Sequence, residues 1–461
     1  MLSFLRREPG FYSRTFRLAL PLILQNLVTT SLAFVDTFMV GLIGDTELSA
    51  VTAANAPVFL VQVIIFGFMS GLTVLTSQFW GKGDTDSINR YMGAALYAAV
   101  LLSSLVAVVL FFFPAQVLLL VTNNSILIEV GAPYLRIVGI SYIFNAISSV
   151  YVSMQRSAEN PAFGMVVFTI SMLLNTLLNF ILIFGHFGAP ALGVLGAAIA
   201  TLTSRIVEFL IVLVYALRSR RVPLRFPLIL RPGVSATRTY MKYATPVLAN
   251  EFLWGLGTTV MTSIMGHMAI SADMLAAYAI MGNLDKFTTV SCFGLSGASA
   301  VIVGKRIGEG AGREEVYQVS WSLLMVGLGL GLVLAAALSI ALPTLFIPYL
   351  YPLFSLSEVA TEAAVTLCIL YIFTMPMRSF DIVNITGVLR AGGDVATASL
   401  IDLIPLWFFA VPLTALFGLV LDAPLLLVAI GVYAENFPKL PCGILRLRSR
   451  KWIHNLTETI Q

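Results

Sequence analysis

The chain has 461 residues, of which 58% are hydrophobic and only 11% are charged. A soluble domain carries roughly 25% charged residues, so composition excludes a water-soluble globular protein and makes lipid the solvent. The net charge of +4 does not indicate nucleic-acid binding, because the basic residues lie between apolar segments. The apolar segments are long and continuous, which argues against the alternating strands of a β-barrel.

Twelve apolar segments follow in chain order, and a helix of ~20 apolar residues crosses the ~30 Å of a bilayer core. The first six lie near 15–40, 51–79, 91–112, 128–153, 162–184 and 191–216. The second six lie near 240–265, 275–303, 316–342, 358–388, 396–418 and 424–441. The widest gap, 217–239, predicts a cytoplasmic linker between an N-terminal lobe (1–216) and a C-terminal lobe (240–461). The basic start carries no signal-cleavage pattern, so we expect the first helix to insert uncleaved.

Basic residues fall on one set of alternating connections. These connections hold 22 of the 27 Lys and Arg residues, from Arg6 near the start, through the linker, to Arg390 and Lys451. The opposite loops, near 41–50, 113–127, 185–190, 267–274, 343–357 and 419–423, hold none. The positive-inside rule then places both termini in the cytoplasm of an inner-membrane protein.

The two lobes repeat one pattern. The first helix runs from Pro21 to Gly41 and the seventh from Pro246 to Gly266, with matching Thr37 and Thr262. Turns after the second, fourth, eighth and tenth helices also match in order. Six helices per lobe give both lobes the same orientation, so they are expected to be parallel repeats related by a pseudo-two-fold axis along the membrane normal. This architecture is typical of secondary transporters that work by alternating access.

Several motifs resemble those of the MATE (multidrug and toxic compound extrusion) family. They are VDTFMVGLIG at 35–44, SQFWGKGD at 77–84, LLNTLLNFILIFG at 173–185, GAAIAT at 196–201 and GVLRAGGD at 387–394. The RAGGD ending is most similar to the DinF-like branch. The resemblance covers nearly the whole chain. It implies a V-shaped fold of twelve transmembrane helices and export of amphipathic organic cations and drugs, driven by Na⁺ or H⁺.

Four polar residues of the N-terminal lobe are candidates for coupling-ion binding. Asp36 lies deep in the first helix, Asn175 and Asn179 share one face of the fifth, and Thr201 lies at a similar depth in the sixth. Charge inside a membrane is costly and therefore marks function. Oxygen donors of this kind suit a hard cation such as Na⁺, and a desolvated carboxylate can instead carry a proton. The family resemblance places an ion site here. The alternative is that the two asparagines only join helices by hydrogen bonds.

The C-terminal lobe has its own charges within apolar segments. Candidates for coupling or substrate contact are Glu251, Asp285, Lys286, Arg378 and Asp381. Arg378 and Asp381, three residues apart, are expected either to neutralise each other or to take part in transport. Asp402 is a further acid without an assigned role.

We therefore predict a monomeric exporter that uses a cation gradient and no enzymatic cofactor, with small organic cations and membrane lipid as its partners. One alternative is a flippase for a lipid-linked or amphipathic metabolite, which would line its cavity with cations. The cations available for that role are Arg136, Arg205, Lys286, Arg378 and Lys439. An integral-membrane enzyme is the second alternative, but the sequence shows no paired catalytic carboxylates and no His-rich metal motif. It also shows no Walker A motif, so the energy for transport is expected to come from an ion gradient.

Overall fold

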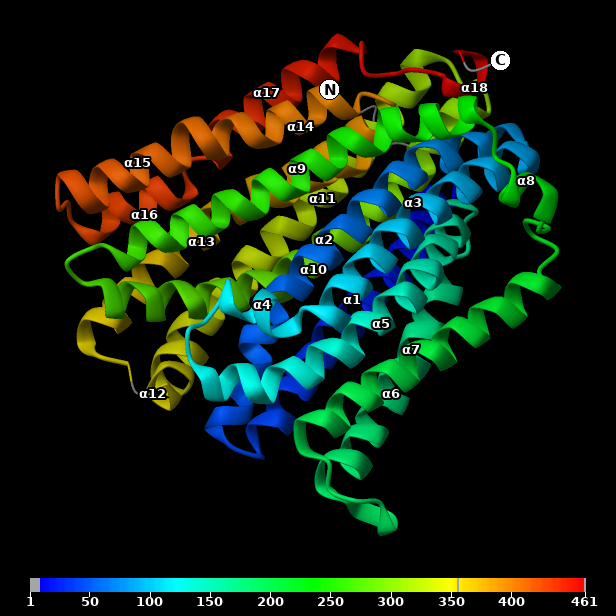
Figure 1. The fold of residues 1–461 in the computed structure, drawn as a ribbon. Coiled ribbons are helices and arrows are strands. Elements are labelled where there is room, and N and C mark those ends of the chain that lie inside the picture. Colours follow the sequence, from blue (N-terminus) through cyan, green and yellow to red (C-terminus); the bar gives the residue numbers. More distant parts are fainter. Residues whose placement is uncertain (1–8, 355, 460–461) are drawn as a thin grey trace. The chain divides into compact units, whose positions relative to one another are not determined.

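The computed structural model describes residues 9–354 and 356–459, and within those ranges the regular structure is helical, with no strand (Figure 1). The chain forms two compact units. Unit N comprises Leu24–Leu248, and unit C comprises Met1–Ile23 with Ala249–Gln461. The boundaries fall inside two long helices, α1 (Phe11–Gly41) and α9 (Val234–Gly266), so each of these helices contributes to both units. The predicted division at 217–239 instead assigns α1 to the N-terminal lobe and α9, from residue 240 onward, to the C-terminal lobe. This division stays a prediction.

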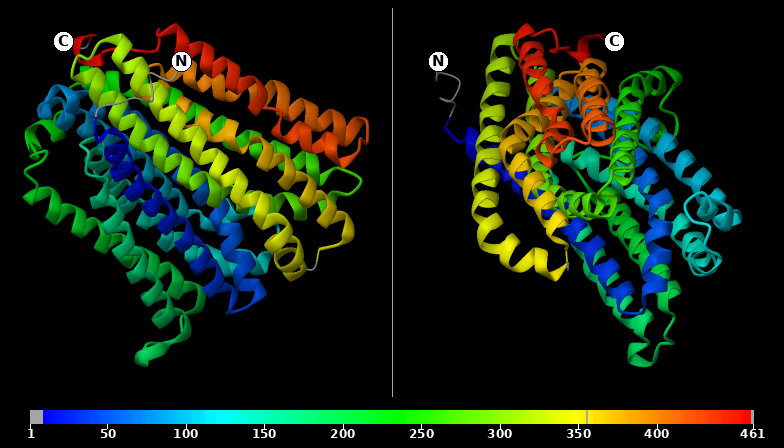
Figure 2. Two further views of the ribbon diagram at one scale, coloured as in Figure 1. Left: turned by 180° about the vertical axis from the view of Figure 1, so that it is seen from behind. Right: turned by 90° about the vertical axis from the view of Figure 1, so that its left-hand side faces the viewer.

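Unit N is built around a long central helix, α5. Besides its parts of α1 and α9, the unit contains α2 (Asp45–Lys82), α3 (Thr85–Phe112), α4 (Pro114–Leu119), α5 (Ser125–Ser157), α6 (Pro161–Phe184), the 3₁₀ turn η2 (His186–Gly188), α7 (Gly193–Arg218) and α8 (Phe226–Leu230). Helix α5 packs against α2, α3, α6 and α7. Helices α6 and α7 form an antiparallel hairpin closed by η2 (Figure 2).

Two of the repeat motifs are helix-to-helix turns. In SQFWGKGD, Gly83 ends α2 with a positive φ of 76°, and Asp84 caps α3 by accepting a hydrogen bond from Ser87 N at 3.0 Å. In GVLRAGGD, Gly393 has a φ of 85°, and Asp394 precedes α14 and binds Arg446 Nε at 2.5 Å. Glycine tolerates this left-handed backbone. Aspartate is a favoured capping residue, as at Asp84, whereas Asp394 makes no capping bond to α14 and serves as the partner of Arg446. Both motifs therefore have structural reasons for their residues.

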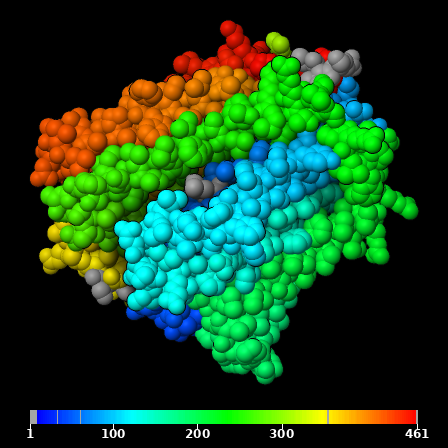
Figure 3. Space-filling view, in the orientation of Figure 1, coloured from blue at the N-terminus to red at the C-terminus, as the bar shows by residue number. Residues whose placement is uncertain are grey.

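Unit C is organised around α13, which packs against α10, α11, α16 and α17. Its helices are α10 (Ser271–Gly308), α11 (Arg313–Ala341), α12 (Tyr351–Leu353), α13 (Glu358–Ile382), α14 (Val395–Pro405), α15 (Val411–Ala415), α16 (Leu425–Tyr433), α17 (Asn436–Ser449) and α18 (Leu456–Thr459). Four π-helical segments continue them: η3 (Leu342–Leu350), η4 (Val383–Leu389), η5 (Leu406–Ala410) and η6 (Leu416–Val420). Residues 249–266 of α9 lie beside α14 and α15 on the surface (Figure 3), and the indole of Trp407 donates to Leu253 O at 3.3 Å.

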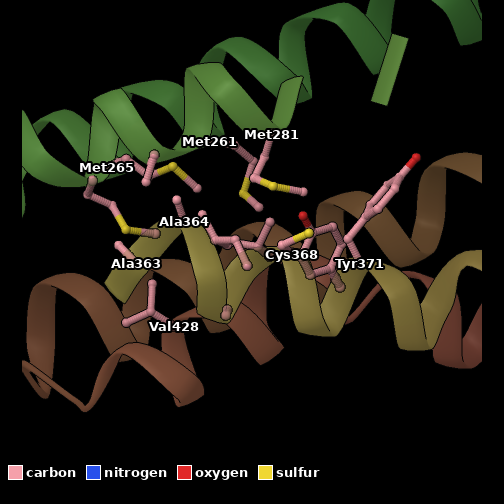
Figure 4. Packing of buried hydrophobic residues seen from close by; sticks show 14 of the residues in the cluster. Met261, Met265, Met281, Ala363, Ala364, Cys368, Tyr371 and Val428 are labelled. Atoms are coloured by element: carbon pink, nitrogen blue, oxygen red, sulfur yellow. The ribbon is translucent and has the colours of Figure 1, made fainter. Parts of the chain in front are cut away.

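Methionine and small side chains fill one core of unit C (Figure 4). Met261 and Met265 of α9 and Met281 of α10 pack towards Ala364 and Cys368 of α13. Methionine adapts to irregular gaps, which suits helices interrupted by π segments.

Ten helices in the described part of the chain are long and apolar enough to cross a membrane. The two other predicted spans, 240–265 and 424–441, correspond to α9 and to the pair α16 and α17. The span 424–441 is broken by a turn at Ala434 and Glu435, between α16 and α17. One predicted loop was wrong: residues 343–350 continue α11 as η3 and lead into α12, because the prolines in this apolar stretch distort the helix without ending it.

Candidate functional site

The predicted N-terminal cluster assembles from three helices of unit N. Asn179 of α6 donates from Nδ2 to Asp36 Oδ1 of α1 at 2.6 Å, and to Asn175 Oδ1 at 3.2 Å. Asn175 donates from Nδ2 to Thr201 Oγ1 of α7 at 3.4 Å. Asn175 and Asn179 are 2% and 1% exposed. The four residues chosen from the sequence are therefore joined by a chain of hydrogen bonds.

The amide of Asn175 fits its neighbours better after a half-turn. In that orientation its nitrogen donates to Asp36 Oδ1 at 2.8 Å, and its oxygen accepts from the Thr201 backbone N–H at 3.3 Å. Amide orientations are assigned from such networks. Asp36 then accepts hydrogen bonds from two amides, which stabilise its charge.

Serine residues extend this polar cluster along α6 and α7. Ser204 Oγ lies 3.4 Å from Asn175 Nδ2 and donates to Thr201 O at 2.9 Å. Ser171 Oγ of α6 donates to Ser204 O at 3.4 Å. Both serines are buried. Sequence reasoning missed them, although Ser171 precedes Asn175 by four residues and so shares its helix face.

One oxygen of the cluster has no partner. Asn179 Oδ1 is buried and makes no hydrogen bond in the described part of the chain. With the Asp36 carboxylate and the Thr201 hydroxyl, it supplies oxygen donors of the type that hard cations prefer. Among the described residues no group of three or more His, Cys, Asp and Glu could hold a metal ion. The cluster therefore suits a monovalent cation or a proton better than a transition metal.

An ion pair lies further along α7. Arg205 Nη1 is 2.7 Å from Glu208 Oε2, and Glu208 is fully buried. The Arg205 charge also acts favourably on Asp36. The sequence analysis named Arg205 but missed Glu208, which the spacing of three residues could have indicated.

Arg378 and Asp381 do not form the expected pair. Arg378 Nη2 instead lies 2.9 Å from Asp285 Oδ1 of α10, and the Tyr371 hydroxyl donates to the same carboxylate oxygen at 3.0 Å. The guanidinium also stacks over Tyr371, 5.7 Å from the ring centre. Helices α10 and α13 pack against each other, and this brings Asp285 within reach of Arg378. Lys286, next to Asp285, is exposed.

Three further ion pairs lie within unit C, and two of them share Lys439. Glu251 Oε1 of α9 is 3.1 Å from Arg390 Nη2. Lys439 Nζ of α17 is 2.9 Å from Asp402 Oδ1 and 2.8 Å from Glu435 Oε2. Arg390, predicted on a cytoplasmic connection, lies at the end of the helix directly before the glycine turn of the GVLRAGGD motif, and its side chain is 1% exposed because Glu251 neutralises it inside the unit.

Three of the five cations considered for a flippase are thus neutralised by carboxylates: Arg205, Arg378 and Lys439. The other two, Arg136 and Lys286, are exposed. A pyrophosphate would meet few free cations here.

Comparisons with known proteins agree with this architecture. The chain is 18% identical to a solved structure described as an outward-facing conformation of a multidrug resistance MATE family transporter of the MOP superfamily. The TM-score is 0.84, and the match covers 97% of both chains. A MATE transporter of Vibrio cholerae, VcmN in its bent form, gives a TM-score of 0.83 at 18% identity over 96% of this chain and 99% of that one. These likenesses establish the two-lobe fold of MOP superfamily transporters.

Relatives and a family profile add the sequence evidence. The chain is 26% identical to the uncharacterized transporter YisQ of Bacillus subtilis, over 95% of this chain and 94% of that protein. It is 22% identical to the probable multidrug resistance protein NorM of Thermotoga maritima, over 96% and 94%. The profile described as MatE matches residues 21–181 and 246–416. The chain therefore belongs to the MatE family, and it is a multi-pass membrane transporter rather than an enzyme.

Proposed function

We propose that this transporter exports amphipathic organic cations and drugs by alternating access, in exchange for Na⁺ or H⁺. Relatives described as multidrug resistance proteins support the substrate class. The parallel sequence repeat supports alternating access. The observation that carries the coupling step is the hydrogen bond from buried Asn179 to half-buried Asp36, because a carboxylate beside amides inside a membrane protein marks an ion pathway.

Asp36 is the ion-binding group in this proposal, with Asn175, Asn179 and Thr201 around it. A proton on Asp36 would remove the charge that the two amide N–H groups now stabilise. A Na⁺ ion would instead require amide oxygens, so the amides would rotate. Either event changes the hydrogen bonds that join α1, α6 and α7.

Ion binding and drug binding should oppose each other. If the ion favours a packing of α1, α6 and α7 that binds drug weakly, linkage requires that drug weakens ion binding by the same factor. The ion would then enter from outside and drive release of the drug there.

The test is transport by purified protein in liposomes. Ethidium flux would be followed with a Na⁺ gradient and a pH gradient imposed separately, for wild type and Asp36→Asn. We expect one gradient to drive flux, and the variant to lose that flux while still binding ethidium. Asp45→Asn, the same change at an exposed site at the start of α2, is the matched control. Gradient-driven flux retained by Asp36→Asn would refute the coupling role.

We also propose that the protein works as a monomer in the inner membrane, with both termini in the cytoplasm. The distribution of basic residues supports this orientation. A Lys451→Cys variant in a Cys442→Ser background should react with a membrane-impermeant maleimide in inverted vesicles but not in intact spheroplasts. Light scattering in detergent would report the oligomeric state.

A further inference from the structure

The chain between α7 and α9 is basic and carries no acid. No Asp or Glu occurs between Glu208 and Glu251. The same stretch contains seven cations, and all of them are exposed: Arg218, Arg220, Arg221, Arg225, Arg231, Arg238 and Lys242. A cluster of this kind beside a membrane span is typical of contact with anionic lipid.

Few of these charges are satisfied within the protein. Arg225 pairs with Asp86 of α3, and Arg221 donates to the backbone oxygen of Ala158 at 2.6 Å. Three others have no acidic partner in the part of the chain that the structure describes: Arg218, Arg220 and Arg231. This segment therefore presents positive charge that an external anion can neutralise.

Helix α8 is held against α3 by hydrogen bonds at both of its ends (Figure 1). Asn89 donates from Nδ2 to Pro223 O at 3.1 Å and accepts from Arg225 N at 3.2 Å. The Tyr97 hydroxyl donates to Leu230 O at 2.8 Å. The basic segment is thus fixed to the side of a membrane helix.

The contact at Gly93 places α8 at the edge of the apolar part of α3. A Cβ atom at Gly93 would lie 2.3 Å from Ile229 O, so the two backbones touch there. Gly93 lies three residues beyond Arg90, the last charged residue of α3, which is ~4.5 Å along the helix axis. At that depth the headgroups of a bilayer meet the acyl chains.

The outward side of α8 is apolar. The helix reads FPLIL between Arg225 and Arg231, and its Phe226 and Leu230 side chains are 49% and 61% exposed. Acyl chains would cover these two side chains, while the flanking arginines extend towards the lipid phosphates. An apolar turn between two cations therefore matches both parts of an anionic phospholipid.

We propose that residues 218–231, the basic linker, bind anionic phospholipid in the adjacent leaflet. Phe226 and Leu230 lie among the acyl chains, and the unpaired arginines bind the phosphates. In the proposed orientation this is the cytoplasmic leaflet. The site lies within unit N and shares no residue with the Asp36 cluster.

Thiol labelling of the full-length protein in nanodiscs tests the proposal. The nanodiscs contain phosphatidylcholine alone or phosphatidylcholine with phosphatidylglycerol. The reporters are Phe226→Cys and Leu230→Cys, each in a Cys442→Ser background, since the two other cysteines are buried. Each arginine near an anionic surface strengthens association roughly five-fold. We therefore expect an uncharged maleimide to label both reporters at least about ten-fold more slowly when phosphatidylglycerol is present.

Three controls separate lipid binding from general effects of charge. Lys451→Cys, exposed in unit C, reports how the anionic surface alters thiol reactivity. Neutralising the unpaired arginines should remove the protection, in a triple variant of Arg218→Gln, Arg220→Gln and Arg231→Gln. An equal change among exposed cations of unit C should leave it intact, in a triple variant of Arg313→Gln, Arg448→Gln and Lys451→Gln.

Four results would overturn the proposal. The first is equal labelling of the reporters in both lipids. The second is protection that survives in the linker triple variant, and the third is protection that the unit C triple variant removes equally. The fourth is protection by inorganic phosphate in phosphatidylcholine nanodiscs, because it would identify a site for a free anion instead. Since none of these readouts involves drug flux, failure of the proposed export function would leave this test intact.

Discussion

Replacing Glu208 with glutamine should destabilise unit N, because it removes the counter-charge of Arg205 from a buried position. Glu208 is fully buried, and its Oε2 lies 2.7 Å from Arg205 Nη1. Breaking a buried ion pair by removing one partner costs about 3–5 kcal/mol. Arg205 is 19% exposed, so its charge can partly rehydrate, and we expect a loss near the lower end, ~3 kcal/mol.

The double variant Arg205→Met with Glu208→Gln distinguishes a lost charge pair from lost packing. Replacing both partners leaves no unpaired charge, so most of the lost stability should return. The assay is thermal unfolding in detergent, followed by tryptophan fluorescence. One scan rate is used throughout, because membrane proteins often unfold irreversibly. The unfolding temperatures of wild type and of the double variant should both lie above that of the single variant Glu208→Gln. Glu129→Gln, at an exposed position of α5, should lie within about 0.5 kcal/mol of wild type. A double variant less stable than Glu208→Gln would refute the reasoning.

Three further predictions use the same thermal assay. Gly196→Ala should cost about 1–3 kcal/mol, because its Cβ would lie 2.4 Å from the backbone oxygen of Leu182, whereas Gly255→Ala, with no atom within 4 Å, should be nearly neutral. Asp84→Ala should cost about 0.5–2 kcal/mol by removing the cap of α3, and Asp84→Asn should restore most of it. Lys439→Met should cost about 3–5 kcal/mol by leaving Asp402 without its cation, and a second change, Asp402→Asn, should recover part of that loss.

Most of the helices could be predicted from the sequence, because each membrane span needs a long apolar segment and most basic residues lie in the connections between these segments. It missed the extension of α11 through η3, since prolines that end a soluble helix are tolerated within membranes. It also predicted that Asp36, Asn175, Asn179 and Thr201 lie at similar depths, and the structure brings them together. Depth follows from counting residues along a helix, so this cluster was accessible to sequence reasoning.

Ion-pair partners were not accessible in the same way, because they depend on which faces of two helices meet. The sequence predicted the connection beside Arg390 but not its ion-pair partner, Glu251, which lies 139 residues away. Pairing of Arg378 with Asp381 on its own helix was one of the two alternatives drawn from the sequence, and in the structure Arg378 pairs with Asp285 instead. Spacing along one helix restricts the choice of partners but does not decide it.

The internal repeat preserves the helices but not their charges. Counting from Pro21 and Pro246, the position equivalent to Asp36 is Met261, which is 3% exposed in the methionine-rich core of unit C. A charged acid at this position would be buried among apolar side chains, which is costly. Unit C instead carries partly buried acids on other helices, where Asp285 is paired with Arg378 and Asp402 with Lys439. The Asp36 cluster therefore has no symmetric copy at the equivalent position of unit C, and the repeat alone does not predict where a coupling acid lies.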